Sequence, residues 1–306
     1  MITFTNQTMQ EILPILMSLL KEEKTCTFTI LNPDIENTYA GSSIEIAGQT
    51  YLYRSYKAWS DLAELLLCKM YTPEKIDKHL IKLTFTKLNT DSFHTDHKDN
   101  EKYGIDSHFS QIHKMEEPAF LYYYLQALEN VKIENKTNIL NLGVNRGDEF
   151  QVIKNLLDTK KYEKINFIGI DHSNSAIAYA NTLFGEKNVT FYAADINEID
   201  SLNLDTFDLL ISIGTLQSPS INYKPFLMHL VQNYLKKDAA IILGFPNSRW
   251  IGGELIYGAK VPNYVMNEMG LVLGDIIFAK KYLQQKKYRV TITGKHYLFL
   301  TATKIG

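Results

Sequence analysis

Several features that would place the chain in a specialised class are scarce in its sequence or missing from it. The 306 residues include two cysteines, Cys26 and Cys68, without a CxxC pair, which favours free thiols in a reducing cytoplasm over a disulfide or zinc scaffold. No apolar run reaches the ~20 residues that cross a bilayer, and the N-terminal stretch, interrupted by Gln10, Glu11 and Pro14, is not typical of a secretory signal. The net charge of -2 provides no overall attraction to nucleic acid or to an anionic membrane. We therefore predict a cytoplasmic protein that engages no membrane.

From Thr137 onward the sequence alternates short apolar runs with segments of helical length. Continuous apolar runs, typical of parallel strands covered on both faces, lie at 138–142, 165–170, 189–194, 207–213 and 239–245. Helices are indicated at 148–158, 174–184 and 224–237. This order predicts a doubly wound α/β sheet with right-handed crossovers.

The last part of the chain adds an antiparallel element to this sheet. After a helix at 275–287, strands at 288–293 and 296–304 are joined by the two-residue turn Gly294-Lys295. A two-residue connection cannot make a parallel crossover, so the last strand must run antiparallel to its neighbour. We therefore expect a mostly parallel seven-stranded sheet with an antiparallel C-terminal hairpin.

The first hundred residues predict a smaller α+β domain. Helices are expected at 7–21 and 59–70, with strands at 24–31, 43–46 and 50–54. The polar stretch 91–106 has no hydrophobic periodicity, so the boundary is placed near residue 105, giving domains 1–105 and 106–306. A helix at 116–131 precedes the first strand of the large sheet.

The stretch ILNLGVNRGDEF, residues 139–150, places a glycine loop at the carboxyl end of that first strand, where open α/β folds bind ligands. Gly143 and Gly147 are separated by three residues, which disfavours the GxGxxG dinucleotide loop, and the GxxxxGK[ST] phosphate loop is missing as well. Asp171 ends the second strand, where a carboxylate can accept hydrogen bonds from both hydroxyls of a ribose. Asp195 ends the third strand and can accept a hydrogen bond from an exocyclic amine such as that of adenine.

Together these residues resemble the class I S-adenosylmethionine-dependent methyltransferases over residues 116–306. The first motif of that family, an acidic residue, any residue and then GxGxG, corresponds to Asn141, Leu142 and the loop 143–147. The sequence departs from it twice, with Asn141 in place of the acid and Asn145 in place of the middle glycine. Asn145 is expected to make the same turn, because Asn is common at positive φ. Asn141 lacks the charge that family members commonly use near the ammonium group of the cofactor.

The resemblance implies S-adenosylmethionine as cofactor and a role for each further site residue. Asp171 would hold the ribose, His172 would lie against the adenine edge, and Asp195 with the backbone of Ile196 would read the adenine amine. The cofactor-binding set so implied comprises Asn141, Gly143, Asn145, Gly147, Asp171, His172, Asp195, Ile196, Ser212 and Gly214, with Gln217 toward the substrate.

The acceptor side is less determined by the sequence. Methyl transfer from a sulfonium requires mainly alignment and exclusion of water, so the lack of an obvious general-base motif is no argument against it. The Asp/Asn-Pro-Pro-Tyr/Phe run of base-modifying enzymes is missing after the fourth strand. No catalytic metal is predicted, and the stretch FHTDH (93–97) is not expected to bind one. The segment 244–264 is either a lid at the substrate mouth or a plain surface loop. The former would bring Asn247, Arg249, Trp250 and Tyr257 to the substrate, with Glu254 nearby.

Three functions remain open at this point. A small-molecule methyltransferase is the first choice, because neither the whole chain nor its N-terminal module is basic, and that module would join residues 246–273 around the acceptor. A tRNA or rRNA methyltransferase with an N-terminal RNA-binding module is the second. A basic cluster around Lys280, Lys281, Lys286, Lys287 and Arg289 is either an RNA contact or a solvated helix face. A non-catalytic cofactor-binding or scaffold protein is the third. The sequence does not indicate an oligomeric state.

Overall fold

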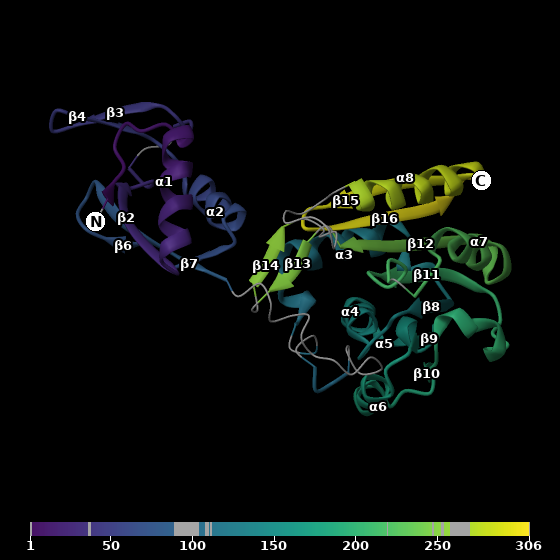
Figure 1. Ribbon diagram of the computed structural model, residues 1–306. Coiled ribbons are helices and arrows are strands. Elements are labelled where there is room, and N and C mark those ends of the chain that lie inside the picture. The colour runs from purple at the N-terminus through teal and green to yellow at the C-terminus, as the bar shows by residue number, and fades with distance from the viewer. Residues whose placement is uncertain are drawn as a thin grey trace. The chain divides into compact units, whose positions relative to one another are not determined.

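The protein consists of two compact units. The structure, a computed structural model, describes residues 2–35, 38–88, 104–107, 110, 112–218, 220–246, 248–251, 254–257 and 270–305. One unit contains Met1–Phe93 together with Trp250–Tyr257, and the other contains His94–Arg249 and Gly258–Gly306. Figure 1 labels their helices and strands. In the described part of the chain no helix combines the length and apolar character needed to span a membrane.

The first unit has the predicted α+β composition. Its elements are β1 (Ile2–Thr3), α1 (Met9–Glu22), β2 (Thr25–Leu31), β3 (Ser43–Ile46), β4 (Gln49–Leu52), α2 (Tyr56–Leu65), β5 (Cys68–Met70), β6 (Glu74–Lys75) and β7 (Leu80–Lys87). The sheet has the order β1-β2-β7-β5, with β6 pairing β7, and β3 and β4 form a separate hairpin. Apolar side chains of α1 and α2 share one core with this sheet, centred on Phe28, Trp59 and Phe85.

One helix of this unit ends earlier than the sequence predicts. Helix α2 stops at Leu65, and residues 68–70 of the expected helix 59–70 form strand β5. Leu67 takes a φ of 53°, a left-handed conformation that helical periodicity cannot anticipate for a leucine. The chain therefore turns out of the helix and buries Cys68 in the sheet.

The second unit contains the large sheet, in the predicted doubly wound arrangement. Its strands are β8 (Asn138–Leu142), β9 (Asn166–Asp171), β10 (Val189–Ala193), β11 (Phe207–Ile213), β12 (Leu235–Pro246), β15 (Tyr288–Gly294) and β16 (Tyr297–Lys304). Its helices are η2 (Lys114–Glu116), α3 (Pro118–Asn130), η3 (Ile133–Asn135), α4 (Asp148–Leu156), α5 (Thr159–Tyr162), α6 (Asn174–Leu183), η4 (Ile196–Leu202), α7 (Tyr223–Asn233) and α8 (Gly270–Gln285). Strands β13 (Ser248–Ile251) and β14 (Glu254–Tyr257) pair with each other, and Trp250–Tyr257 belongs to the first unit.

The strand order in the large sheet is β10-β9-β8-β11-β12-β16-β15. All neighbouring pairs from β10 to β12 are parallel, while β16 runs antiparallel to β12 and β15, which confirms the predicted C-terminal hairpin. Because the strand order reverses between β8 and β11, the carboxyl ends of these two strands form the topological switch point of the sheet. One apolar core packs α3, α4 and α6 on one face, and a second packs α7 and α8 on the other.

One helix of this unit also ends before its predicted limit. Helix α7 ends at Asn233 instead of residue 237, and β12 already begins at Leu235. The amide of Phe207 donates to the carbonyl of Tyr234 at 2.8 Å, so pairing with β11 replaces the last helical turn. Leu235 continues the helical spacing of apolar residues, but its side chain is buried as part of strand β12.

Candidate functional site

The glycine loop between β8 and α4, residues 143–147, contains three residues in left-handed backbone conformations. Gly143 has a φ of 74°, Asn145 of 47° and Gly147 of 89°, so Asn145 makes the turn expected of it. At Gly143 a Cβ atom would stand 1.8 Å from Oγ1 of Thr215, and at Gly147 it would stand 2.7 Å from the ring of Phe184. Glycine is therefore needed at both positions for close approach as well as for backbone conformation.

Asp171, the last residue of β9, points its carboxylate at this loop. The side chain is 6% exposed, and the backbone amide of Asn145 donates to Oδ2 at 2.9 Å while that of Ser173 donates to Oδ1 at 3.0 Å. Each oxygen thus receives one backbone hydrogen bond and has capacity for another. Nδ1 of His172 lies 3.4 Å from Oδ1, and about half of the His172 side chain is exposed. The arrangement fixes a carboxylate that can accept from two adjacent hydroxyl groups.

The other predicted cofactor residues lie at neighbouring strand ends. Asp195 caps η4 and accepts from the amide of Asn197 at 2.9 Å, and Ile196 is buried. Ser212 is buried in β11, where its hydroxyl donates to the carbonyl of Leu142 at 3.2 Å. It therefore links two strands at the switch point.

The residues after β11 pack closely against the rest of the sheet. Gly214 has a φ of 75°, and a Cβ atom there would stand 2.1 Å from the hydroxyl of Tyr297. Gln217 has a buried Oε1 without a hydrogen-bond partner within the described residues. This acceptor atom could bind a ligand, and the predicted place of Gln217 toward the substrate stays a prediction.

A polar cluster lies at the two ends of the glycine loop. It comprises Asn141, which was predicted for the cofactor site, and two residues that sequence reasoning missed, Glu149 on the first turn of α4 and Lys114 in η2. Burial raises the pKa of Glu149 to about 7, while Lys114 and the neighbouring Asn141 amide act in the opposite direction. Burial lowers the pKa of Lys114, and the carboxylates of Glu149, Asp148 and Asp171 oppose that change. The Lys114 ammonium also lies over the ring of Tyr297, 5.6 Å from its centroid.

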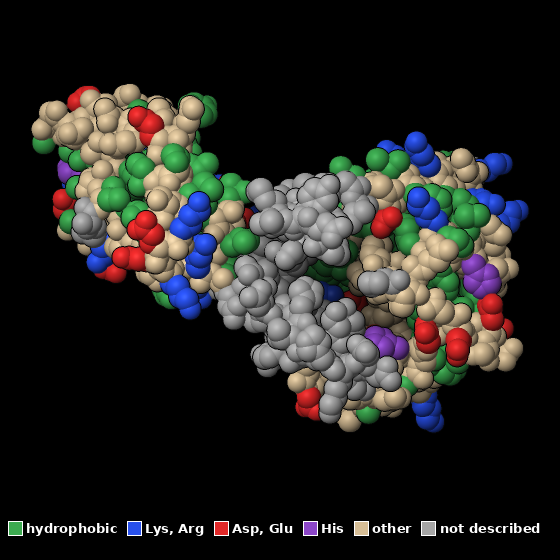
Figure 2. All heavy atoms as spheres, in the orientation of Figure 1, with side chains coloured by type: hydrophobic (Ala, Val, Ile, Leu, Met, Phe, Trp, Pro, Cys, Tyr) green, Lys and Arg blue, Asp and Glu red, His purple; other side chains and the backbone are tan. Residues whose placement is uncertain are grey.

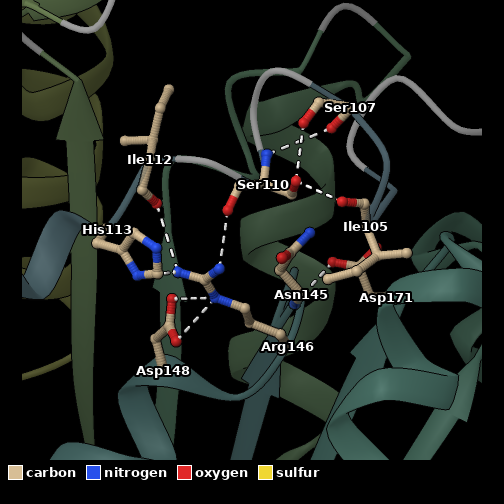
Figure 3. A network of polar contacts seen from close by, with 9 residues as sticks. All are labelled: Ile105, Ser107, Ser110, Ile112, His113, Asn145, Arg146, Asp148 and Asp171. Carbon is tan, nitrogen blue, oxygen red and sulfur yellow. Dashed lines mark hydrogen bonds and ion pairs between the residues drawn. The ribbon is translucent and has the colours of Figure 1, made fainter.

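Arg146 anchors the segment that precedes α3 to the same loop (Figure 3). Its Nη1 donates to the carbonyl of Ser110 at 2.8 Å, its Nη2 contacts Nδ1 of His113 at 2.9 Å and the carbonyl of Ile112 at 3.5 Å, and its Nε donates to both oxygens of Asp148 at 3.0 Å. A single buried guanidinium therefore ties Ser110, Ile112 and His113 to the loop that orients Asp171.

The sequence of the second unit matches a known family. Residues 133–290, more than half of the chain, match the family described as "Methyltransferase domain". The chain belongs to this family. Its β8–β12 region with the glycine loop is an S-adenosylmethionine-dependent methyltransferase domain, as the order of its motifs led us to expect. No curated protein sequence matches the chain significantly.

Solved structures similar to this methyltransferase include three enzymes of different kinds. The plantazolicin methyltransferase BpumL in complex with SAH is 15% identical, with a TM-score of 0.48, over 71% of this chain and 94% of that one. A SAM-dependent methyltransferase from Aquifex aeolicus is 20% identical, with a TM-score of 0.42, over 64% and 98%. Precorrin-6y C5,15-methyltransferase from Geobacter metallireducens GS-15 is 13% identical, with a TM-score of 0.42, over 60% and 88%. Identities this low describe a likeness of fold and assign no substrate.

The residues present in the methyltransferase fit this cofactor. The fixed carboxylate of Asp171 suits a ribose diol, and Asn141, which is 1% exposed, has an amide nitrogen without a hydrogen-bond partner in the described part of the chain. Such an orphaned donor at a strand end is typical of a site that completes its hydrogen bonds with a ligand.

Some of the predicted site residues lie outside what the structure describes. Asn247 is one of them, as is the FHTDH stretch, and for Arg249, Trp250, Glu254 and Tyr257 only the backbone is described. Among the described residues no group of three or more His, Cys, Asp or Glu side chains is arranged to hold a metal ion. The assignment of individual residues to cofactor or substrate stays a prediction.

Proposed function

We propose that this methyltransferase acts on a small-molecule acceptor and binds the cofactor along the carboxyl ends of β8, β9, β10 and β11. The observation that supports the cofactor position is the carboxylate of Asp171, which accepts one backbone hydrogen bond on each oxygen at 2.9 and 3.0 Å. Held in this way, it does not have to be ordered when a ribose binds, so little conformational entropy is lost. Asp195, Ile196 and His172 stand at adjacent positions of the same edge for the adenine.

The charge distribution supports a small acceptor over RNA. In residues 1–93 eleven carboxylates outnumber nine basic side chains, so the first unit has no positive excess with which to attract a phosphate backbone. On the face shown in Figure 2, several basic side chains of the second unit lie together over α8. Lys286, Lys287 and Lys237 lie close enough to Lys304 to lower its pKa, in addition to the effect of its burial.

This lysine cluster lies away from the proposed site within the same unit. Lys237 stands at the start of β12 and Lys304 at the end of the antiparallel β16, which is the amino edge of the parallel strands. The glycine loop and Asp171 lie at the carboxyl edge. RNA bound by these lysines would therefore be held at the edge opposite the proposed cofactor site.

The chemistry asked of the chain's own residues is mainly positional. When bound, S-adenosylmethionine supplies an activated methyl group. Asp171 and the loop 143–147 would hold the cofactor, and Arg146 would keep the segment before α3 in place beside it. Gln217, with its buried acceptor oxygen, would orient the acceptor molecule. In this assignment the rate depends on alignment and exclusion of water more than on a general base.

Calorimetry with S-adenosylhomocysteine tests the cofactor site. The native protein is expected to bind it, and Asp171→Ala is expected to weaken binding about 100-fold, because two charge-assisted hydrogen bonds to the ribose are lost. Asp205→Asn, which removes an exposed carboxylate of the same unit, serves as the matched control and should bind as the native protein does. Native protein that binds neither this product nor S-adenosylmethionine would exclude the proposed function.

The acceptor class is tested by transfer of a labelled methyl group from S-adenosylmethionine into a fractionated cell extract. Label in the low-mass, nuclease-resistant fraction is expected. Label recovered only in a high-mass fraction that nuclease destroys would instead identify an RNA methyltransferase, as would RNA affinity that falls steeply with salt.

We also infer that the protein works in a reducing compartment such as the cytoplasm. Both cysteines are free and buried, and burial raises the pKa of Cys68 to about 11, so neither favours thiolate chemistry. Thiol titration of the denatured protein isolated without reductant should find two free thiols.

A further inference from the structure

The family pattern has an acid at the position of Asn141, and the side chain found there is deeply buried. It is 1% exposed, and its Nδ2 has no hydrogen-bond partner within the described residues. An amide can donate at this place but brings no negative charge. A ligand with a positive group here would therefore need its counter-charge from another residue.

A carboxyl group reaches the same place from the start of α4. Glu149 is 7% exposed, and its carboxyl group lies beside the Asn141 amide. The other buried residues of α4, Phe150 and Ile153, are apolar, as packing against the sheet requires. A buried carboxyl group is costly, and an apolar side chain of similar volume commonly stabilises a fold as well or better. Its presence next to a cofactor loop therefore points to a ligand.

The charged and titratable groups around Glu149 come from three elements. Lys114 of η2 stabilises the ionised form of Glu149, whereas Asp148 of the same helix destabilises it. The phenol of Tyr124 in α3 donates to the backbone carbonyl of Glu149 at 3.3 Å. Lys114 is also close enough to Asp148 and Asp171 for their carboxylates to raise its pKa, although burial lowers it more. The pair of opposite charges thus joins η2 to the start of α4, near the carboxylate that we propose holds the ribose.

We propose that Glu149 takes over the role of the missing acid at position 141 and accepts a hydrogen bond from the ammonium group of the cofactor. Lys114 would pair with the carboxylate of the cofactor. This proposal rests on the proposed function, because it requires S-adenosylmethionine at this site. The amino acid end of the cofactor is a zwitterion, and a buried Glu/Lys pair complements it without adding net charge. The acid has in effect moved from β8 to the first turn of α4.

Two ligands that differ in this part of the molecule test the proposal. S-adenosylhomocysteine carries the amino acid, whereas methylthioadenosine has the same nucleoside without it. Glu149→Gln is expected to weaken S-adenosylhomocysteine about tenfold or more and methylthioadenosine less than about twofold. The matched control, Glu129→Gln on the exposed end of α3, should leave both affinities unchanged.

Proton release gives a readout that a merely structural role would not change. Burial raises the pKa of Glu149 to about 7, and a bound ammonium group favours the ionised form. Near pH 7 the native protein should therefore release a fraction of a proton when S-adenosylhomocysteine binds, measured by calorimetry in buffers of different ionisation enthalpy. Glu149→Gln should release none, and its affinity should no longer fall between pH 7.5 and pH 6.

A double variant tests the relocation itself. Asn141→Asp combined with Glu149→Gln returns the acid to β8, and it should regain most of the affinity for S-adenosylhomocysteine. Thermal unfolding of each variant shows which of them are folded.

Three outcomes overturn the proposal. Equal loss of both ligands in Glu149→Gln would mean that the residue only supports the loop, and unchanged binding with unchanged proton release would mean that it contacts no cofactor. A folded double variant that binds no better than Glu149→Gln would contradict the relocation. If the native protein binds neither ligand, the proposed function fails together with this proposal, which is distinguishable from a selective failure in the variant.

Discussion

Replacing Arg146 by lysine should release the segment before α3 from the glycine loop. The lysine keeps the positive charge and can still pair with Asp148, but it has one ammonium group in place of the planar guanidinium fork. An ammonium group that pairs with Asp148 reaches neither the carbonyl of Ser110 nor Nδ1 of His113, which Arg146 contacts at 2.8 and 2.9 Å. Two hydrogen bonds to a charged group would therefore be lost, and the carbonyl of Ser110 would lose its partner.

The magnitude follows from these two bonds. Hydrogen bonds to charged groups contribute about 1.5 kcal/mol each in net terms, and we discount the contact with the exposed His113. The expected cost of about 2 to 3 kcal/mol corresponds to a roughly 30- to 150-fold increase in local opening of the segment. The long contact to the carbonyl of Ile112, at 3.5 Å, adds little.

Native-state hydrogen exchange measures this opening directly. The amides of Glu116 and Glu117, bonded to the carbonyls of His113 and Lys114, should exchange faster in Arg146→Lys, while the amides of β11 stay protected. Arg289→Lys, at an exposed arginine of β15, is the matched control. Exchange at residues 110–117 that changes less than about threefold, in an otherwise unchanged protein, would refute the anchoring role of Arg146.

Three further predictions concern the same loop. Gly143→Ala should destabilise the domain by about 2 kcal/mol or more, since φ is positive and the new Cβ would meet Oγ1 of Thr215; adding Thr215→Gly should recover part of the loss in urea unfolding. Asn145→Gly should change the unfolding free energy by less than about 1 kcal/mol, whereas Asn145→Val should cost more than the glycine variant, because a β-branched residue is strained at a φ of 47°. The folded protein favours the protonated form of Glu149, so this contribution to stability is full below the unfolded pKa and is lost as the pH rises through about 7. The unfolding free energy of Glu149→Gln should therefore rise relative to that of the native protein between pH 5 and pH 8. A difference that does not vary with pH would contradict this.

The parts of the fold that sequence reasoning predicts well are those in which local pattern and tertiary environment agree. Strand β8 was predicted with its observed limits, 138–142, because a parallel strand covered on both faces is a continuous apolar run that ends at a glycine turn. The hairpin of β15 and β16 follows from a connection too short for any other geometry. Asn145 was expected at positive φ, and its φ of 47° confirms this.

The parts that the sequence does not reveal depend on contacts made by distant segments. Leu235 fits the helical spacing of α7 as well as the strand that it begins, and only its pairing with Phe207 decides between them. Lys114 and Glu149 are 35 positions apart in different helices, so no motif connects them. The one local signal was Glu149 itself, a charged residue just after the glycine loop at the start of α4. The roles of the individual site residues toward cofactor and acceptor remain predictions.

Strand β16 has a consequence for how the protein is made. Because it runs against its neighbours, its first residue, Tyr297, stands at the carboxyl edge of the sheet, with its hydroxyl against Gly214 and its ring beneath Lys114. A nascent chain will have produced all five strands from β8 to β12 before the ribosome reaches this tyrosine. The sheet can form its parallel part early during synthesis, yet Tyr297 meets Gly214 and Lys114 only once β16, the last of the sheet's strands in chain order, has been made. The domain should therefore acquire cofactor affinity abruptly, after β16 has emerged.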